Sequence, residues 1–362
     1  MSAKPAIVTT LKHPSPSVLE FFVKYHQAIG FEHLFLFFDD AEDPTLAQAQ
    51  AYSGVTAIPN DEILHSAWVH SPQYDRLQRF LHDHYTRQVL NCEVAVALAY
   101  EAGCDWLLHI DVDELFYSSR CSAREHFDAL DARGIENVVY MNFEAVPESE
   151  DIDNYFAEVT LFKKNPYLGN YRRFDKHQER LLNGMIERYG LVPYHGYFLY
   201  YALGKSAARV TPGLGVRPPA LWGVHRFFHW FDPGQKRATA GDDQVVLHYP
   251  CCGFAHFWRR YDGYKRLIGL LPGMFAHDAV HLTQRGDVEG ARKLYREVVM
   301  LGNDFEALLA ADILCRIEEP ARMWRRLHGL TGAERLEPSD VLAGRPPSRT
   351  SHSQARRSSR SS

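Results

Sequence analysis

Three short apolar runs, separated by helical patterns, limit the folds open to this chain more than any other feature. The runs cover residues 6–11, 33–38 and 106–110, and short runs bounded by polar or turn residues are typical of buried strands. Residues 17–29 carry apolar side chains at helical spacing behind a serine and stop at a glycine. A long helical pattern at about 77–102 precedes the third run. This order predicts an α/β fold with a mainly parallel sheet.

Later residues predict smaller elements around an irregular middle. A polar stretch fills about 60–75, and a strand at 138–143 should continue the sheet after a helix near 123–132. Residues 144–241 are rich in Tyr, Arg, Gly and Pro, which is typical of loops and short strands. The remaining expected elements are a helix near 175–189, a strand at 245–249, and helices at 254–270 and 291–309.

Composition narrows the classes of function. The 362 residues are 46% apolar and carry a formal charge of -5, so the chain can bury a sizeable core but has no broad cationic field for nucleic acid. The six cysteines form no C-x-x-C pair, which disfavours a zinc site. The first apolar run is far too short to span a bilayer. We therefore expect no nucleic-acid partner, no membrane span and a cytoplasmic location.

The third apolar run ends in two carboxylates, which are the strongest chemical signal in the sequence. Asp111 and Asp113 follow it at positions i and i+2, at the edge where open α/β sheets bind ligands. A bend in the backbone would turn both side chains toward one cation, whereas an extended backbone would point them to opposite faces. Mg2+ and Mn2+ prefer such oxygen ligands and keep open positions for phosphate oxygens. A solvated acidic turn is the alternative interpretation.

The sequence around this acid pair resembles a known family. Residues 106–116, W-L-L-H-I-D-V-D-E-L-F, look like the W-L-x-x-x-D-x-D-E-F segment of glycosyltransferase family 92 and its family 2-like relatives. Residues 19–31 resemble the stretch where such proteins carry an acidic residue, then Y-H, then I-G-V. Residues 37–43, F-F-D-D-A-E-D, resemble their Y-D-D-x-S-x-D loop. These matches keep the family's order over about residues 6–117.

Downstream, the resemblance continues through shorter motifs and has one departure. Residues 204–207, G-K-S-A, followed by His225 and then by H-Y at 248–249, are similar to the G-K-S/A and H-Y elements of these proteins. Many members have Lys-Asn-Glu after the first strand, whereas this chain has K-H-P at 12–14. The departure concerns nucleotide contacts of the first loop and not the fold.

The resemblance implies a GT-A fold, which is a Rossmann-like, mixed and mainly parallel sheet flanked by helices. The implied catalytic domain covers residues 1–270, with a nucleotide-sugar-binding half at 1–117 and an acceptor-facing half at 118–270. A helical extension at 271–343 and a disordered Ser/Arg tail at 344–362 would follow.

The implied activity is metal-dependent transfer of a sugar, as in hexosyltransferases, from a nucleotide-sugar to a glycan or other hydroxyl acceptor. A uridine diphosphate donor and inversion at the sugar carbon are also implied by the resemblance alone. The location would be the Golgi lumen if an upstream membrane anchor were missing, because many eukaryotic transferases of this kind are tethered there.

Three residues are predicted to hold the Mn2+ or Mg2+ ion. Asp111 and Asp113 come from the acid pair, with Asp113 as the more direct ligand, because the second acid of such motifs commonly reaches the ion. His248 closes a short late strand, where GT-A proteins often supply an imidazole ligand. A buried histidine bonded to the backbone is the alternative for His248.

A larger set of polar residues is predicted to contact the nucleotide part of the donor. Carboxylates at the end of the second strand could accept hydrogen bonds from a ribose or from uracil. Basic residues could meet phosphate oxygens, one of them, Lys205, only through the resemblance. Capped turns and structural ion pairs would explain the same residues. The full set is Thr9, Thr10, Lys12, Asp39, Asp40, Asp43, Arg87, Asp111 and Lys205.

An inverting transfer needs a general base near the acceptor hydroxyl, normally Asp or Glu. Glu179, Asp242 and Asp243 are the candidates, since all three lie in the segment expected to face the acceptor. No pattern in the sequence selects one of them.

Two other classes of function compete with sugar transfer. A nucleotidyl or phosphoryl transferase would also use paired acids on a metal at a strand end. The chain lacks the G-x-x-x-x-G-K-S/T phosphate loop, because the G-K-S triplet at 204–206 has no first glycine at the required spacing. A non-catalytic carbohydrate-binding protein on the same fold is the third class. Glycan binding without any nucleotide-sugar hydrolysis would favour it.

Overall fold

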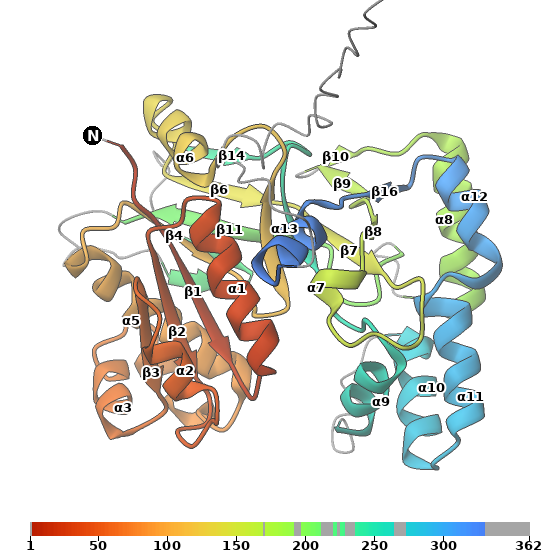
Figure 1. Ribbon diagram of the computed structural model, residues 1–362, viewed down its shortest axis with the longest axis horizontal. Helices are drawn as coiled ribbons and strands as arrows, with labels where there is room; N and C mark the ends of the chain where they lie inside the picture. The colour runs from red at the N-terminus through yellow and green to blue at the C-terminus, as the bar shows by residue number, and fades with distance from the viewer. Residues whose placement is uncertain are drawn as a thin grey trace, which may run out of the picture.

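The molecule is built on two sheets, each covered by helices. The computed structural model describes residues 2–168, 171–191, 197–210, 220–222, 225–228, 236–263 and 273–329. The first four strands belong to one sheet, a second sheet lies beside it, and the later strands alternate between the two (Figure 1).

The first sheet has seven strands in the order β14-β6-β11-β4-β1-β2-β3. β1 pairs in parallel with β2 and β4, and β2 with β3, while β11 is antiparallel to both β4 and β6. The predicted fold class, a mixed and mainly parallel sheet flanked by helices, is confirmed. The strands are β1 Pro5–Leu11, β2 His33–Phe38, β3 Val55–Pro59, β4 Trp106–His109, β6 Asn137–Tyr140, β11 Lys205–Arg209 and β14 Arg237–Thr239.

Helices cover both faces of this sheet. Successive apolar side chains of β1 point to opposite faces, and each face packs against helices. Ile7 packs on the face covered by α1 (Pro16–Ala28) and α6 (Ala123–Ala132). Val8 packs on the opposite face, which α5 (His84–Glu101) covers. A strand buried on both faces reads as a continuous apolar run, which is why the sequence predicts it.

The second sheet has five strands in the order β16-β8-β7-β15-β5. β15 lies between β5, with which it is antiparallel, and β7, with which it is parallel. The strands are β5 Glu114–Ser118, β7 Asn142–Val146, β8 Leu161–Lys163, β15 Gln244–His248 and β16 Leu314–Arg316. Two small antiparallel pairs add β9 Tyr167–Leu168 with β10 Tyr171–Arg172, and β12 Ala220–Trp222 with β13 Arg226–Phe228.

The remaining helices lie around these sheets (Figure 1). Short ones near the first sheet are α2 Leu46–Gln50, α3 Glu62–Trp68, α4 Tyr74–Leu77 and the 3-10 turn η1 Gln78–Phe80. Those near the second sheet are α7 Tyr155–Glu158, α8 Lys176–Tyr189, α9 Phe254–Gly263, α10 Gly273–Gln284, α11 Val288–Leu294, the π turn η4 Tyr295–Val299, the 3-10 turn η5 Gly302–Asp304, α12 Phe305–Ala310 and α13 Glu319–Leu327.

The single strand predicted at 138–143 is wrong, because the run divides at Met141 between the two sheets. β6 pairs with β11 in the first sheet, whereas β7 pairs with β15 in the second. The buried side chain of Asn142 fixes the crossing by donating to the carbonyl oxygen of Tyr201, at 2.7 Å, and accepting from the backbone N–H of Gly204, at 3.1 Å. An unbroken apolar run does not reveal such a change of sheet.

Two helix predictions also need correction, and one helix was not predicted. The helix predicted at 77–102 begins only at His84, because the Asp83 side chain accepts from a backbone N–H and caps it there. The polar stretch at 60–75, for which no helix is predicted, contains α3, capped in the same way by Asp61. The helix predicted at 291–309 is interrupted before α12, where Leu301 has a φ of 64°.

Other expectations are met or fall outside the described part of the chain. The strand at 245–249 and the helix near 175–189 are confirmed as β15 and α8. α9 accounts for the first part of the helix expected at 254–270; residues 264–270 and the tail at 344–362 are outside the described residues. The domain boundaries stay a prediction, since strands of the two sheets alternate along the chain. Within the described ranges, no helix has the length and apolar character needed to cross a bilayer.

Candidate active site

The acid pair lies in the turn that joins the two sheets. β4 ends at His109 in the first sheet and β5 begins at Glu114 in the second. The N–H of Asp111 donates to the Glu114 carboxylate at 2.8 Å, and the Glu114 N–H donates back to the carbonyl oxygen of Asp111 at 3.0 Å. Just after β15, the N–H of Tyr249 donates to the carbonyl oxygen of Asp113 at 2.9 Å. The backbone is therefore bent and held, as a shared cation would require.

Helix α1 fixes the strand that follows this turn. The Tyr25 hydroxyl donates to the carbonyl oxygen of Phe116 at 3.1 Å, and the N–H of Phe116 donates to His26 Nε2 at 3.2 Å. His26 Nδ1 lies 2.8 Å from the carbonyl oxygen of Phe22, so the imidazole donates there and accepts from Phe116. Burial lowers the pKa of His26 to about 3, which keeps the ring neutral. The Y-H sequence thus serves the geometry of the acid turn.

A buried lysine ties Asp111 to Glu114. Lys205 is fully buried, and its Nζ lies 2.7 Å from Asp111 Oδ2 and 3.3 Å from Glu114 Oε2. The second carboxylate oxygen of Asp111 accepts from Gln88 at 2.8 Å. Burial favours neutral Asp111, but Lys205 outweighs it and holds the pKa of Asp111 well below its usual range. Both Asp111 oxygens are thus already hydrogen-bonded. The Lys205 ammonium contacts two carboxylates, which disfavours its predicted contact with phosphate.

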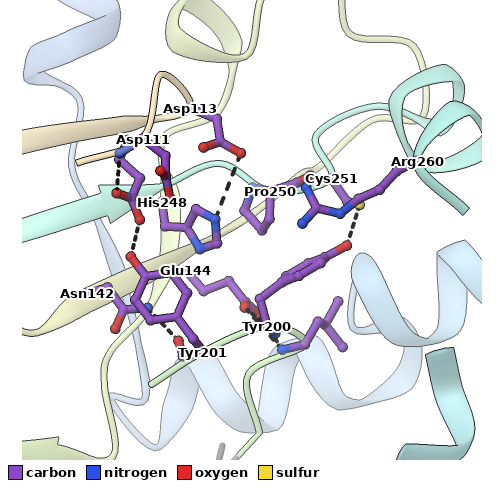
Figure 2. Close-up of polar contacts among 12 residues, drawn as sticks. Asp111, Asp113, Asn142, Glu144, Tyr200, Tyr201, His248, Pro250, Cys251 and Arg260 are labelled. Atoms are coloured by element: carbon purple, nitrogen blue, oxygen red, sulfur yellow. Dashed lines mark hydrogen bonds and ion pairs between the residues drawn. The ribbon is translucent and has the colours of Figure 1, made fainter. Parts of the chain in front are cut away.

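Asp113 faces His248 across a gap of 3.9 Å between Oδ2 and Nε2 (Figure 2). Burial, with the neighbouring charge of Asp111, raises the pKa of Asp113 to about 6. Burial, with the positive charges of Arg260 and Lys205, lowers the pKa of His248 and keeps its ring neutral. Nδ1 of His248 is buried and has no hydrogen-bond partner among the described residues.

This pair fits a hard or borderline divalent ion. A carboxylate oxygen and a neutral imidazole nitrogen 3.9 Å apart can both contact one ion at bond lengths of about 2.1 Å. Within the described part of the chain, no cluster of three or more His, Cys, Asp or Glu side chains is arranged to hold a metal. Asp113 and His248 would therefore supply two ligands, and the remaining positions would fall to other groups such as phosphate oxygens.

The end of β2 and helix α5 bring two of the predicted nucleotide contacts, Asp39 and Arg87, into an ion pair with each other. Asp39 is nearly buried, and its carboxylate accepts from Arg87 at 2.6 Å and lies 3.3 Å from His84 Nδ1. Burial would favour the neutral acid, yet His84 and Arg87 hold the pKa of Asp39 well below its usual range. Arg87 is therefore part of an ion pair within the protein, which is the alternative interpretation of this residue to a phosphate contact.

The neighbouring loop has a similar structural explanation. Asp43 is buried and accepts from the backbone N–H of His13, at 2.6 Å, and from the N–H and hydroxyl of Thr45, as in a capped turn. Asp40 is more exposed and lies 3.1 Å from His13 Nε2. Lys12 is exposed just beyond the end of β1.

The two threonines of β1 point to opposite faces of the sheet. Thr10 accepts from Asn91 at 3.0 Å, and Asn91 in turn accepts from Trp68 at 2.9 Å, so the Thr10 hydroxyl belongs to a buried network. Thr9 is fully buried, and its hydroxyl has no hydrogen-bond partner among the described residues.

The three candidates for the base lie in surface ion pairs away from the acid turn. Asp243 pairs with Arg120 at 2.9 Å, Asp242 binds Arg173 through both oxygens, and Glu179 lies 3.2 Å from its partner Arg172. Asp242 and Asp243 precede β15, whereas the site is at the far end of that strand. From Gln244 to His248, β15 advances by four residue steps, or roughly 13 Å. The structure does not bring these carboxylates beside Asp113.

Sequence patterns miss four residues that lie around the pair of Asp113 and His248: Glu144, Tyr200, Tyr201 and Arg260 (Figure 2). The ring centres of Tyr200 and Tyr201 lie 5.8 and 5.0 Å from that of His248. Tyr201 also donates its hydroxyl to Glu114. Glu144 is placed opposite His248 by the sheet register. A single sequence does not reveal this register, so it gave no signal for Glu144.

Comparison with solved structures gives only distant similarity. A mannosyltransferase of S. cerevisiae matches 41% of this chain and 41% of its own, with 10% identity and a TM-score of 0.25. Core-mannan synthase A of Aspergillus fumigatus, in a Mn/GDP form, matches 57% and 60%, with 6% identity and a TM-score of 0.25. UDP-glucose pyrophosphorylase of Leishmania major matches 67% and 62%, with 9% identity and a TM-score of 0.27. Likeness at this level carries no argument about function.

Comparison of sequences finds closer relatives. No protein-family model matches the chain, so the assignment to family 92 stays a prediction. One protein of Arabidopsis thaliana is 30% identical over 324 residues, which cover 82% of this chain and 66% of that protein. A second is 28% identical over 263 residues, 66% of this chain and 46% of that protein. The chain therefore spans just under two thirds of one relative and about half of the other, and both relatives are named glycosyltransferase-like.

Proposed function

We propose that this chain transfers a sugar from a nucleotide-sugar to a hydroxyl acceptor such as a glycan, with Mn2+ or Mg2+ at the acid turn. The observation that carries the proposal is the pair of Asp113, which is partly buried, and His248, which is buried: a carboxylate faces a neutral imidazole where the two sheets join. The names of the two plant relatives support the same class of reaction.

In this proposal Asp113 and His248 hold the ion, which when bound neutralises charge on the diphosphate as it leaves. Lys205 and Glu114 keep the acid turn bent, and Asp111 takes part through its contact with Lys205. Tyr200 and Tyr201 pack against the His248 ring and limit its movement. The chain's own contribution is thus a rigid, largely dehydrated metal site.

The finer features of the reaction rest on the family resemblance. They are a uridine diphosphate donor, inversion at the sugar carbon, and nucleotide contacts from the ends of β1 and β2. Glu179, Asp242 and Asp243 remain the proposed bases, although each is engaged by an arginine. Asp242 and Asp243 both lie in the turn before β15, whereas Glu179 lies on α8. Glu179→Gln therefore tests the candidate that is separate from the other two.

The test is thermal stability of the whole chain with UDP, GDP and their sugar conjugates, each with and without Mn2+. Binding to the folded state raises Tm by mass action, by about 2.7 kcal/mol of stability at a ligand concentration of 100 times Kd. We expect one nucleotide to raise Tm only with metal, and Asp113→Asn to abolish the rise. Asp278→Asn, a matched change at an exposed aspartate on α10, should keep it. If metal alone shifts Tm and no nucleotide adds to it, the proposed function is wrong.

A further inference from the structure

Arg260 extends from α9 toward the metal-binding pair. Its Nη1 donates to the carbonyl oxygen of Pro250 at 3.4 Å, two residues after His248. Its guanidinium carbon lies 4.3 Å from the centre of the Tyr200 ring, which is a close cation-π stack. Figure 2 shows the guanidinium end directed toward Pro250, on the side of α9 where His248 lies.

The ring on which Arg260 stacks is held from three directions. The Tyr200 hydroxyl lies 2.6 Å from Cys251 Sγ and 3.1 Å from the Tyr261 hydroxyl. Its backbone N–H donates to Glu144 at 3.3 Å. Glu144 is itself buried and paired with Lys163 at 2.9 Å, so this anchor is fixed as well. Arg260 therefore loses little further side-chain freedom when a ligand binds.

The carboxyl groups near the acid turn would repel a diphosphate unless a further cation, such as Arg260, lay close to it. Three carboxyl groups lie in or beside the turn, at Asp111, Asp113 and Glu114, and Lys205 is engaged by two of them. Arg260 lies near the turn, since its guanidinium carbon is 4.3 Å from the centre of the Tyr200 ring and that centre is 5.8 Å from the centre of the His248 ring. A diphosphate entering this region meets negative charge, and one divalent ion supplies only part of the compensation.

A guanidinium is well suited to a diphosphate. Its face can stack on an aromatic ring while its N–H groups, in the plane, donate to two oxygens at once. The guanidinium carbon of Arg260 lies over the Tyr200 ring, which is compatible with this arrangement. Arg87, one of the two basic residues that could meet phosphate oxygens on sequence grounds, is bound to Asp39 through two nitrogens.

We propose that Arg260 binds the diphosphate of the nucleotide-sugar donor through charge-assisted hydrogen bonds, as the protein cation that complements the divalent ion. This assignment rests on the proposed function, because it presumes a nucleotide diphosphate at the acid turn. It adds a residue that neither the acid-pair motif nor the names of the relatives assign.

The test compares ligands that differ only in phosphate number. Isothermal titration with Mn2+ present measures Kd for UDP, UMP, GDP and GMP on the wild type, Arg260→Gln, Arg260→Lys and Arg259→Gln. Arg259 is the matched control, an exposed arginine next in sequence on the same helix. Tm without ligand checks that each variant is folded.

We expect Arg260→Gln to weaken binding of the preferred diphosphate by about 10- to 100-fold, the loss of one or two charge-assisted hydrogen bonds. Binding of the monophosphate should change less than about 3-fold, Arg260→Lys should fall between, and Arg259→Gln should match the wild type. Equal losses for monophosphate and diphosphate, or no loss, would overturn the assignment while leaving the proposed function standing. A wild type that binds none of the four nucleotides would refute the proposed function and the assignment with it.

Discussion

The neutral histidine behind the acid turn makes stability depend on pH in a way that one substitution removes. Burial lowers the pKa of His26 from 6.5 to about 3 in the folded protein. Between these values the unfolded chain binds a proton that the folded chain does not, so stability falls as pH falls below 6.5. From pH 7 to pH 5 this single group accounts for a loss of about 2 kcal/mol of unfolding free energy.

His26→Gln should remove that component, because glutamine does not titrate. At pH 7 we expect a loss of about 1–3 kcal/mol, since the amide cannot reproduce both contacts, to Phe22 O at 2.8 Å and from Phe116 N–H at 3.2 Å. Between pH 7 and pH 5 the variant should lose about 2 kcal/mol less than the wild type, which narrows the difference between them. Urea unfolding at pH 5, 6 and 7 measures both effects.

The comparison with the wild type isolates His26, because other buried groups titrate equally in both proteins. Burial also lowers the pKa of His126 to about 4 and raises that of Glu93 to about 7. His70→Gln, at an exposed histidine, is the control and should keep the wild-type dependence on pH. If His26→Gln loses stability with falling pH as steeply as the wild type, the imidazole is not held neutral and our account of α1 fails.

Three further predictions test other parts of the site and its frame. Lys205→Met should cost about 3–5 kcal/mol, because it leaves buried carboxylates without their cation, whereas Lys24→Met, at a surface pair, should cost under about 1 kcal/mol; urea unfolding compares them. Gly204→Ala should destabilise by several times the cost of Gly103→Ala, because both glycines have positive φ but a Cβ at Gly204 would lie 2.2 Å from a backbone carbonyl oxygen and one at Gly103 meets nothing within 4 Å; equal Tm losses would contradict this. Chelation of metal with EDTA should return the Tm of the nucleotide complex to that of the free protein, and a Tm that stays raised would argue against metal-dependent binding.

Much of the first sheet is predictable from the sequence, and the second is not. Buried strands such as β1 and β2 read as unbroken apolar runs because helices cover both of their faces. The division of one run at Met141 depends on hydrogen bonds that Asn142 donates to Tyr201 and accepts from Gly204, both about sixty positions away. No local pattern contains that information.

The site divides in the same way. Asp113 and His248 can be named from spacing and resemblance, and the structure sets them 3.9 Å apart. The assignment of Arg87 to phosphate fits its contacts poorly, because a nearby carboxylate satisfies the guanidinium first. Arg260 is invisible to sequence reasoning, since its role depends on a tyrosine from a distant loop.

The position of the acid turn between the sheets also determines when it can form during synthesis. Asp111 and Asp113 leave the ribosome well before Lys205 and His248, which supply their counter-charge and facing imidazole. Until β11 and β15 have been made, these carboxylates have no partners from that part of the chain. Contacts of such long sequence separation close late in folding. An N-terminal fragment ending near residue 117 would therefore contain the whole acid motif and yet lack the site.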